Sequence, residues 1–172
     1  MDARASITNA MYQLIQKYPM ERITVDMIIR ESDTSRSTFY RYFEDKYQLL
    51  SQFYEDFAFD LFHYDNWYSV LFEIHTFFKA NQSFFSHAFI VEGQYSYKKF
   101  MMNHGYRLAS ELYRRNNENA ELSFEETEAL HHYVAGGFHL TSRWIERGMD
   151  ISVACHSELL CSCVPKILSK RI

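Results

Sequence analysis

The stretch from Thr24 to Lys46, TVDMIIRESDTSRSTFYRYFEDK, constrains the fold of this chain more than any other feature. Its pattern predicts two short helices, because Thr24 and Ser35 each offer an N-cap hydroxyl before a run of helix-compatible residues. Asp33 can adopt a left-handed backbone and support a tight turn that has no glycine. The second helix carries polar side chains on a face that a hydrophobic core would not accept. We therefore expect a helix-turn-helix here.

The composition favours an all-α protein. With 5 Gly and 2 Pro in 172 residues, turn formers are sparse, and a hydrophobic content of 47% is ample for a buried core. Apolar periodicity predicts about nine helices. Their expected ranges are 3–18, 24–31, 35–45, 46–62, 67–79, 82–91, 94–115, 123–147 and 152–170. We expect a three-helix N-terminal domain over residues 1–46 and a helical domain for dimerisation and ligand binding over residues 47–172.

The charge balance does not indicate nucleic-acid binding by the chain as a whole, because the formal net charge is -4. Residues 1–50 hold seven Lys or Arg and seven Asp or Glu, so any DNA-binding face must be local. Three cysteines, Cys155, Cys161 and Cys163, do not form a disulfide framework, and no signal sequence opens the chain. No apolar run approaches the roughly 20 residues that cross a bilayer. These features predict a cytoplasmic protein without a membrane segment.

The segment from Ser35 to Phe43 has the pattern of a helix that enters the major groove. Phe39 and Phe43, four residues apart, can pack inward while polar side chains face outward. Arg36 is the best candidate for a bidentate contact to guanine, which is worth about 1–3 kcal/mol of discrimination. Hydroxyl and amine groups suit phosphate oxygens, and those expected to do so belong to Thr24, Thr38, Tyr40 and Lys46. On the residues alone, a polar surface helix is an equally good interpretation.

Residues 7–50 resemble the N-terminal domain of the TetR family of bacterial transcriptional regulators. The family pattern has Thr at the start of the second helix, a short turn, then Ser, a basic residue, a small residue, Thr, an aromatic residue and Tyr, often followed by Lys. In this chain those positions are Thr24, Ser35, Arg36, Ser37, Thr38, Phe39, Tyr40, Arg41 to Phe43 and Lys46. The resemblance implies base contacts near Arg36, Ser37 and Tyr42. The expected DNA-binding set is Thr24, Ser35, Arg36, Ser37, Thr38, Tyr40, Arg41, Tyr42 and Lys46.

Two departures from the family pattern concern DNA contacts. Ser37 stands where the family usually has Gly, which adds a side chain where the helix approaches DNA. The basic N-terminal arm of the family is nearly absent, since only Arg4 precedes the core. We therefore expect affinity to depend on the helix pair itself.

A homodimer is expected, because one recognition helix reads few bases and half-sites roughly 34–36 Å apart need two. The segment from Tyr133 to Met149 resembles the penultimate helix of a short C-terminal domain type, in which the last two helices pair with their twins. The predicted interface is Val134, Gly137, Phe138, Thr141, Ile145, Cys155, Leu159, Cys163 and Ile167. The alternative is a stripe packed inside one chain.

Aromatic and soft side chains in the second domain could line a pocket for a small apolar or aromatic effector. The candidates are Trp67, Phe72, His75, Phe78, Phe85, Phe89, Tyr95, Tyr97 and Met101. An ordinary hydrophobic core uses the same residue types, so both interpretations stay open.

Neither a metal nor a cofactor is expected, and we expect no enzyme activity. Glu128, His132 and His139 have helical spacing that could ligate a metal, but no full ligand set accompanies them. No phosphate loop or nucleophile elbow is present. The sequence predicts a homodimeric regulator, a repressor, that binds a palindromic double-stranded DNA operator and is released by a small effector. The alternatives are control by a protein partner or without an effector, and a helical carrier of apolar ligands.

Overall fold

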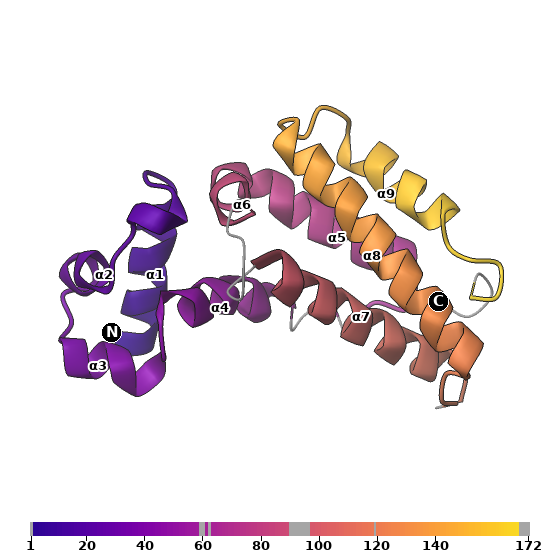
Figure 1. The fold of residues 1–172 in the computed structure, drawn as a ribbon, viewed down its shortest axis with the longest axis horizontal. Helices are drawn as coiled ribbons and strands as arrows, with labels where there is room; N and C mark the ends of the chain where they lie inside the picture. The colour runs from indigo at the N-terminus through magenta and orange to yellow at the C-terminus, as the bar shows by residue number, and fades with distance from the viewer. Residues whose placement is uncertain (1, 59–60, 62, 90–96, 119, 169–172) are drawn as a thin grey trace. The chain divides into compact units, whose positions relative to one another are not determined.

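The computed structural model describes residues 2–58, 61, 63–89, 97–118 and 120–168 (Figure 1). Within these residues the chain is helical and has no strand, which confirms the all-α prediction. The α-helices are α1 (Ala3–Ile15), α2 (Val25–Ser32), α3 (Arg36–Tyr42), α4 (Lys46–Ala58), α5 (Trp67–Ala80), α6 (Gln82–Ala88), α7 (Tyr97–Asn116), α8 (Phe124–Glu146) and α9 (Val153–Ser162). A short 3-10 helix, η1 (Met20–Arg22), precedes α2.

The chain forms two compact units. One comprises Met1–Phe57 and Ser83–Lys98, and the other comprises Ala58–Gln82 and Lys99–Ile172. The first unit thus contains most of α4 and most of α6 as well as the three N-terminal helices. The predicted boundary after residue 46, between the N-terminal domain and the domain for dimerisation and ligand binding, stays a prediction.

The first unit is organised around α1, whose buried residues are Ile7, Ala10, Met11, Leu14 and Ile15. Their three- and four-residue spacing places them on one side of the helix. Both α2 and α3 pack against α1, and they bury Ile28 and Phe39 completely. The N-terminal three-helix arrangement is therefore the one that the sequence predicts.

An aromatic cluster joins α1 to α4 and α6. Tyr12 of α1 stacks on Phe53 of α4 with ring centroids 4.9 Å apart. Phe53 in turn lies 4.3 Å from the ring of Phe84 in α6. His87 donates from Nδ1 to the Ile15 carbonyl at 2.6 Å. These contacts make α6 part of the packing of the first unit.

The second unit is a bundle of α5, α7, α8 and α9. Tyr133 in the first half of α8 donates to the Leu160 carbonyl at 2.9 Å, and Trp144 at its far end stacks on His156 at 4.6 Å. This order of contacts makes α8 and α9 antiparallel. Helix α8 starts at a capping box, in which Ser123 Oγ accepts the Glu126 N–H and the Glu126 carboxylate accepts the Ser123 N–H.

Helix α9 ends at Ser162, well before the predicted Lys170. Cys163 and Val164 turn back through N–H bonds to the carbonyls of Leu160 and Cys161. The turn precedes Pro165, whose ring disfavours helical backbone in the residue before it. Helix α9 therefore ends before the proline. In the part of the chain that the structure describes, no helix is long and apolar enough to span a membrane.

Candidate nucleic-acid interface

The helix-turn-helix begins and turns at the residues that the sequence indicates. Thr24 accepts the backbone N–H of Met27 at 3.2 Å and so caps α2. Asp33 ends α2 with φ 50° and ψ 46°, the left-handed conformation that lets this turn do without glycine. Ser35 accepts the N–H of Thr38 at 3.0 Å and caps α3. Local hydrogen bonds thus fix where α3 begins.

The two faces of α3 differ sharply in burial. Phe39 is fully buried and Phe43, its C-cap, is 2% exposed, so the apolar side faces the core of the unit. Tyr40 is 50% exposed and Tyr42 is 36% exposed. The exposed members of the predicted DNA-binding set are Thr24, Ser35, Arg36, Ser37, Tyr40, Arg41 and Tyr42, while Thr38 and Lys46 are partly buried.

Hydroxyl groups gather at the N-terminus of α3. Ser35 Oγ lies 2.8 Å from Ser37 Oγ and 2.8 Å from Thr38 Oγ1. A helix N-terminus with several hydroxyl groups favours oxygen ligands such as phosphate. The structure therefore brings three of the predicted contact residues into one cluster.

Two arginines on α3 have intramolecular partners. Arg36 forms an ion pair with Asp26, which lies in the first turn of α2. Arg41 lies over the ring of Tyr42, with its guanidinium carbon 4.9 Å from the ring centroid. The role of Asp26 was not predictable from the sequence, because a contact between two helices depends on their crossing geometry.

Lys46 begins α4 and reaches back to the segment before α2. Its Nζ donates to the carbonyls of Met20 at 2.9 Å and Ile23 at 2.7 Å. Burial lowers the pKa of Lys46, while Glu21 and Asp45 act in the opposite direction. Lys46 thus has a structural role that the sequence did not indicate, and its phosphate contact stays a prediction.

The predicted dimer residues fall into two groups. Val134, Thr141 and Ile145 of α8 are buried within the chain. These three pack inside the second unit, and the predicted dimer interface stays a prediction. Gly137 and Phe138 are partly exposed, and the exposed residues toward the C-terminus are Cys155, Leu159, Cys163 and Ile167.

The predicted pocket residues belong to two different units. Phe85, Phe89 and Tyr97 are buried in the first unit. The second unit contains Trp67, Phe72, His75, Phe78 and Met101, of which all but Phe72 are buried. Tyr95 lies outside the described residues. The described members of the set thus belong to the packing of two units, and the pocket stays a prediction.

His75 belongs to a buried chain of polar side chains. Its Nδ1 lies 2.8 Å from Ser157 Oγ, and its ring packs 4.6 Å from that of His156. Thr141 Oγ1 lies 3.2 Å from His156 Nε2. Burial lowers the pKa of His75 to about 3, with His156 adding to the effect. Polar groups from α5, α8 and α9 satisfy one another here.

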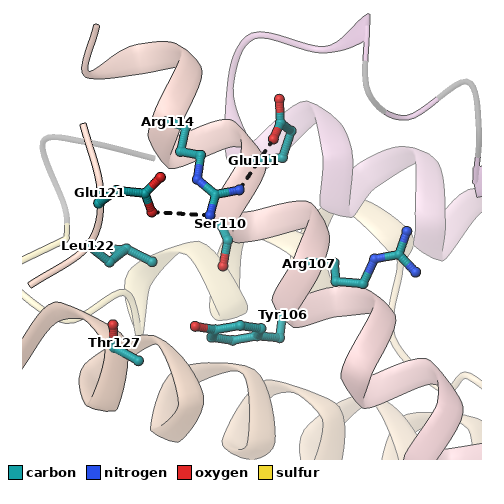
Figure 2. Close-up of a pocket in the computed structure, with 8 residues that line it drawn as sticks. All are labelled: Tyr106, Arg107, Ser110, Glu111, Arg114, Glu121, Leu122 and Thr127. Carbon is teal, nitrogen blue, oxygen red and sulfur yellow. Dashed lines mark hydrogen bonds and ion pairs between the residues drawn. The ribbon is translucent and has the colours of Figure 1, made fainter. Parts of the chain in front are cut away.

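A cavity of about 540 Å³ lies between α7, the following loop and the start of α8. Figure 2 shows Arg114 held there between two carboxylates, at 3.8 Å from Glu111 and 3.2 Å from Glu121. Arg107 adds a second positive charge, so the two arginines and two glutamates of the lining cancel. This cavity contains none of the predicted pocket residues, and its lining selects no ligand charge.

Comparison with known proteins agrees with this geometry. Residues 7–53 match the family described as "Bacterial regulatory proteins, tetR family", and residues 65–165 match the one described as "Transcriptional regulator C-terminal region". The second match covers more than half of the chain. No curated protein sequence matches this chain. The chain belongs to the TetR family of bacterial transcriptional regulators.

Two solved structures share the fold. A protein named "Dihydroxyacetone kinase operon activator DhaS" aligns with a TM-score of 0.71 at 20% identity, over 95% of this chain and 94% of that one. A TetR transcriptional regulator from Streptococcus agalactiae 2603V aligns with a TM-score of 0.68 at 22% identity, over 95% and 94% of the two chains. At these identities the likeness concerns the fold alone.

Proposed function

We propose that this chain is a homodimeric, sequence-specific DNA-binding regulator that represses transcription from a palindromic operator. The observation that carries the proposal is α3, which presents Arg36 and Ser37 at its exposed N-terminal end above a buried Phe39. A helix that reads the major groove needs this combination, because its N-terminal residues meet base edges while its underside packs on protein.

Neutral charge makes a second copy important for affinity. Residues 1–50 carry seven basic and seven acidic side chains, so few phosphates are neutralised by one copy. Two copies double the contacts and set the spacing of the half-sites. The expected operator is therefore two-fold symmetric.

Control by a protein partner, or the absence of any effector, is the second candidate. The observation that favours it is the burial of Phe78, Phe85 and Phe89, which fill the cores of their units. A small apolar effector would have to displace such packed side chains, whereas a protein partner would bind a surface. One protein of the same fold is named an operon activator, so the sign of regulation also needs a test.

Selection from a random duplex pool tests DNA recognition directly. We expect enrichment of a symmetric site whose half-sites lie about 10 base pairs apart, centre to centre, or a multiple of that. Enrichment of no symmetric sequence would contradict the proposal. Arg36→Ala should relax the base preference of the selected site more than Arg41→Ala does, because only Arg36 is placed at the N-terminal end of α3.

A reporter in which the selected site overlaps a promoter then tests the direction of regulation. Repression predicts lower expression when the wild-type chain is present. Higher expression in the presence of the chain would show that it activates transcription instead. The binding assay is then repeated with a metabolite extract and with the protein fraction of a lysate. An effect on DNA binding that is lost when the added fraction is first treated with protease indicates a protein partner, and one that persists indicates a small effector.

A further inference from the structure

The ion pair between Arg36 and Asp26 joins two helices at the face that α3 presents. Asp26 lies in the first turn of α2 and Arg36 is the first residue of α3, so the pair spans the turn of the motif. Both side chains stay largely exposed, at 59% for Arg36 and 68% for Asp26. An exposed pair of this kind adds only about 0–1 kcal/mol to stability. An acid in the first turn of α2 also favours the helix start by about 0.3–1 kcal/mol, so the total contribution of Asp26 to folding is small.

Asp26 brings a negative charge close to the predicted DNA contacts. Thr24, which is expected to meet a phosphate, caps the same helix two residues earlier. A carboxylate next to the DNA backbone repels phosphates unless a cation neutralises it. Arg36 is the cation with which Asp26 pairs.

The pair leaves most of the hydrogen-bonding capacity of Arg36 available. A guanidinium has five N–H donors in one plane, and Asp26 Oδ1 accepts from Nη2. Guanine offers O6 and N7 to two donors of that planar fork. A single phosphate oxygen, in contrast, competes with Asp26 for the same positive charge. Guanine is bound through the orientation of the guanidinium, whereas a phosphate is bound mainly through its charge. The Asp26 carboxylate therefore favours contact with guanine over contact with a phosphate.

We propose that Asp26 is a positioning residue for sequence discrimination, which orients Arg36 toward a guanine edge and weakens its attraction to phosphates of unrelated DNA. The inference rests on the proposed function, since it concerns how the same face of α3 distinguishes one DNA sequence from another. Asp26 acts through Arg36 and touches neither base nor phosphate. Its removal therefore affects discrimination more than affinity.

Asp26→Asn and Glu31→Gln form a matched pair for the test. Glu31 is an exposed residue of the same helix, so each substitution removes one negative charge from α2. Binding of the selected operator and of a scrambled duplex is measured by fluorescence anisotropy between 50 and 200 mM salt. For Asp26→Asn we expect about a tenfold loss in the ratio of the two affinities. The salt slope on scrambled DNA should steepen by about 0.9 per subunit, because Arg36 gains a phosphate contact.

Glu31→Gln should change both affinities by the same factor and leave their ratio intact. An unchanged ratio for Asp26→Asn would overturn the proposal. Combining Asp26→Asn with Arg36→Ala separates positioning from a structural effect: in that background Asp26→Asn should leave the ratio unaltered, and a further drop would also overturn it. Thermal melting shows that each variant is folded. Failure of the wild-type chain to select a symmetric site would contradict the proposed function instead, so the two failures are distinguishable.

Discussion

Ser35 combines the capping of α3 with the placement of its neighbours. Its Oγ accepts the Thr38 N–H at 3.0 Å and lies within hydrogen-bonding distance of the hydroxyls of Ser37 and Thr38, both at 2.8 Å. An N-cap side chain satisfies one of the backbone donors that a helix start leaves open. The same atom therefore affects both the stability of α3 and the orientation of two residues predicted to meet DNA.

Ser35→Ala should lower the free energy of unfolding by about 1 kcal/mol, because the Thr38 N–H loses its acceptor. Urea denaturation followed by circular dichroism measures the loss. Ser37→Ala is the matched control, since Ser37 contacts the Ser35 hydroxyl but caps no backbone group. Equal losses for the two variants would contradict a capping role for Ser35.

Lys46 connects α4 to the segment before α2 through two carbonyls. Lys46→Met keeps the length of the side chain but removes the donor, so the Ile23 carbonyl loses this hydrogen bond. We expect the free energy of unfolding to fall by about 1–3 kcal/mol, measured in urea without DNA. If Lys46 also binds a phosphate, the salt slope of operator binding drops by about 0.9 per subunit. An unchanged unfolding free energy would contradict the structural role.

Single residues were predictable where their effect is local. Thr24, Ser35 and Asp33 act on backbone groups within a few residues, so their capping and turn roles follow from sequence order alone. Lys46 and Asp26 act across the fold, on partners 23 and 10 residues away. Such contacts depend on how helices cross, which spacing along the chain does not contain.

At the scale of helices, the second unit is held together partly by buried polar groups. Trp67 of α5 donates to the Tyr133 hydroxyl at 2.8 Å, and that hydroxyl donates to the Leu160 carbonyl at 2.9 Å. His75, Thr141, His156 and Ser157 make a second chain between the same three helices. Such chains constrain how α5, α8 and α9 align, because a shift of one helix leaves several buried groups unpaired.

This second chain should make stability sensitive to acid. Burial lowers the pKa of His75 to about 3 and that of His156 to about 4, where Arg147 also lowers it and Asp150 opposes the shift. The unfolded chain binds protons at the ordinary histidine value near 6.5, so it gains protons first as the pH falls. Stability is therefore complete above about pH 6.5 and is lost progressively toward pH 3 to 4.

Urea midpoints measured from pH 7.5 to 4.5 should show this loss, at up to about 1.4 kcal/mol per pH unit for each histidine. His75→Gln keeps a hydrogen-bonding group that cannot be protonated, and its stability should decline less steeply with acid. A wild-type chain that is equally stable at pH 7.5 and pH 5 would contradict neutral, buried histidines. The comparison of slopes separates this effect from the cost of the substitution itself.

Helix identity was largely predictable and the use of the aromatic residues was not. Apolar spacing of three and four residues indicates a buried face whatever that face packs against. The apolar spacing around Phe85 and Phe78 is therefore the same kind of pattern, although the two residues lie in different units. A cavity and a core also use the same side chains, and only the packing of several helices decides between them.

The whole molecule needs a surface for a second copy if it reads two half-sites. The exposed residues of α8 include His132, Ala135, Gly136, His139 and Arg143. A Cβ built at Gly136 would meet nothing within 4 Å, so this stretch of helix is open to a close neighbour. On α9, Leu159 is 44% exposed, a large apolar side chain that a partner could cover. We therefore expect the dimer to use this outer side of α8 and α9 rather than the buried Val134, Thr141 and Ile145.

Gly136→Trp tests that expectation, because the open space lets each chain fold while the indole blocks close approach of two α8 helices. Sedimentation equilibrium should show a monomer with an unchanged helical spectrum, and operator affinity should fall by at least about 100-fold as the second recognition helix is lost. Thr76→Trp, at an exposed position of α5, should stay dimeric. Gly136→Ala distinguishes two surroundings of this residue. If Gly136 faces solvent, the substitution should stabilise the helix by about 1 kcal/mol. If Gly136 lies at a close contact between two helices, the substitution should weaken dimerisation. A dimeric Gly136→Trp variant would move the interface away from this side of α8.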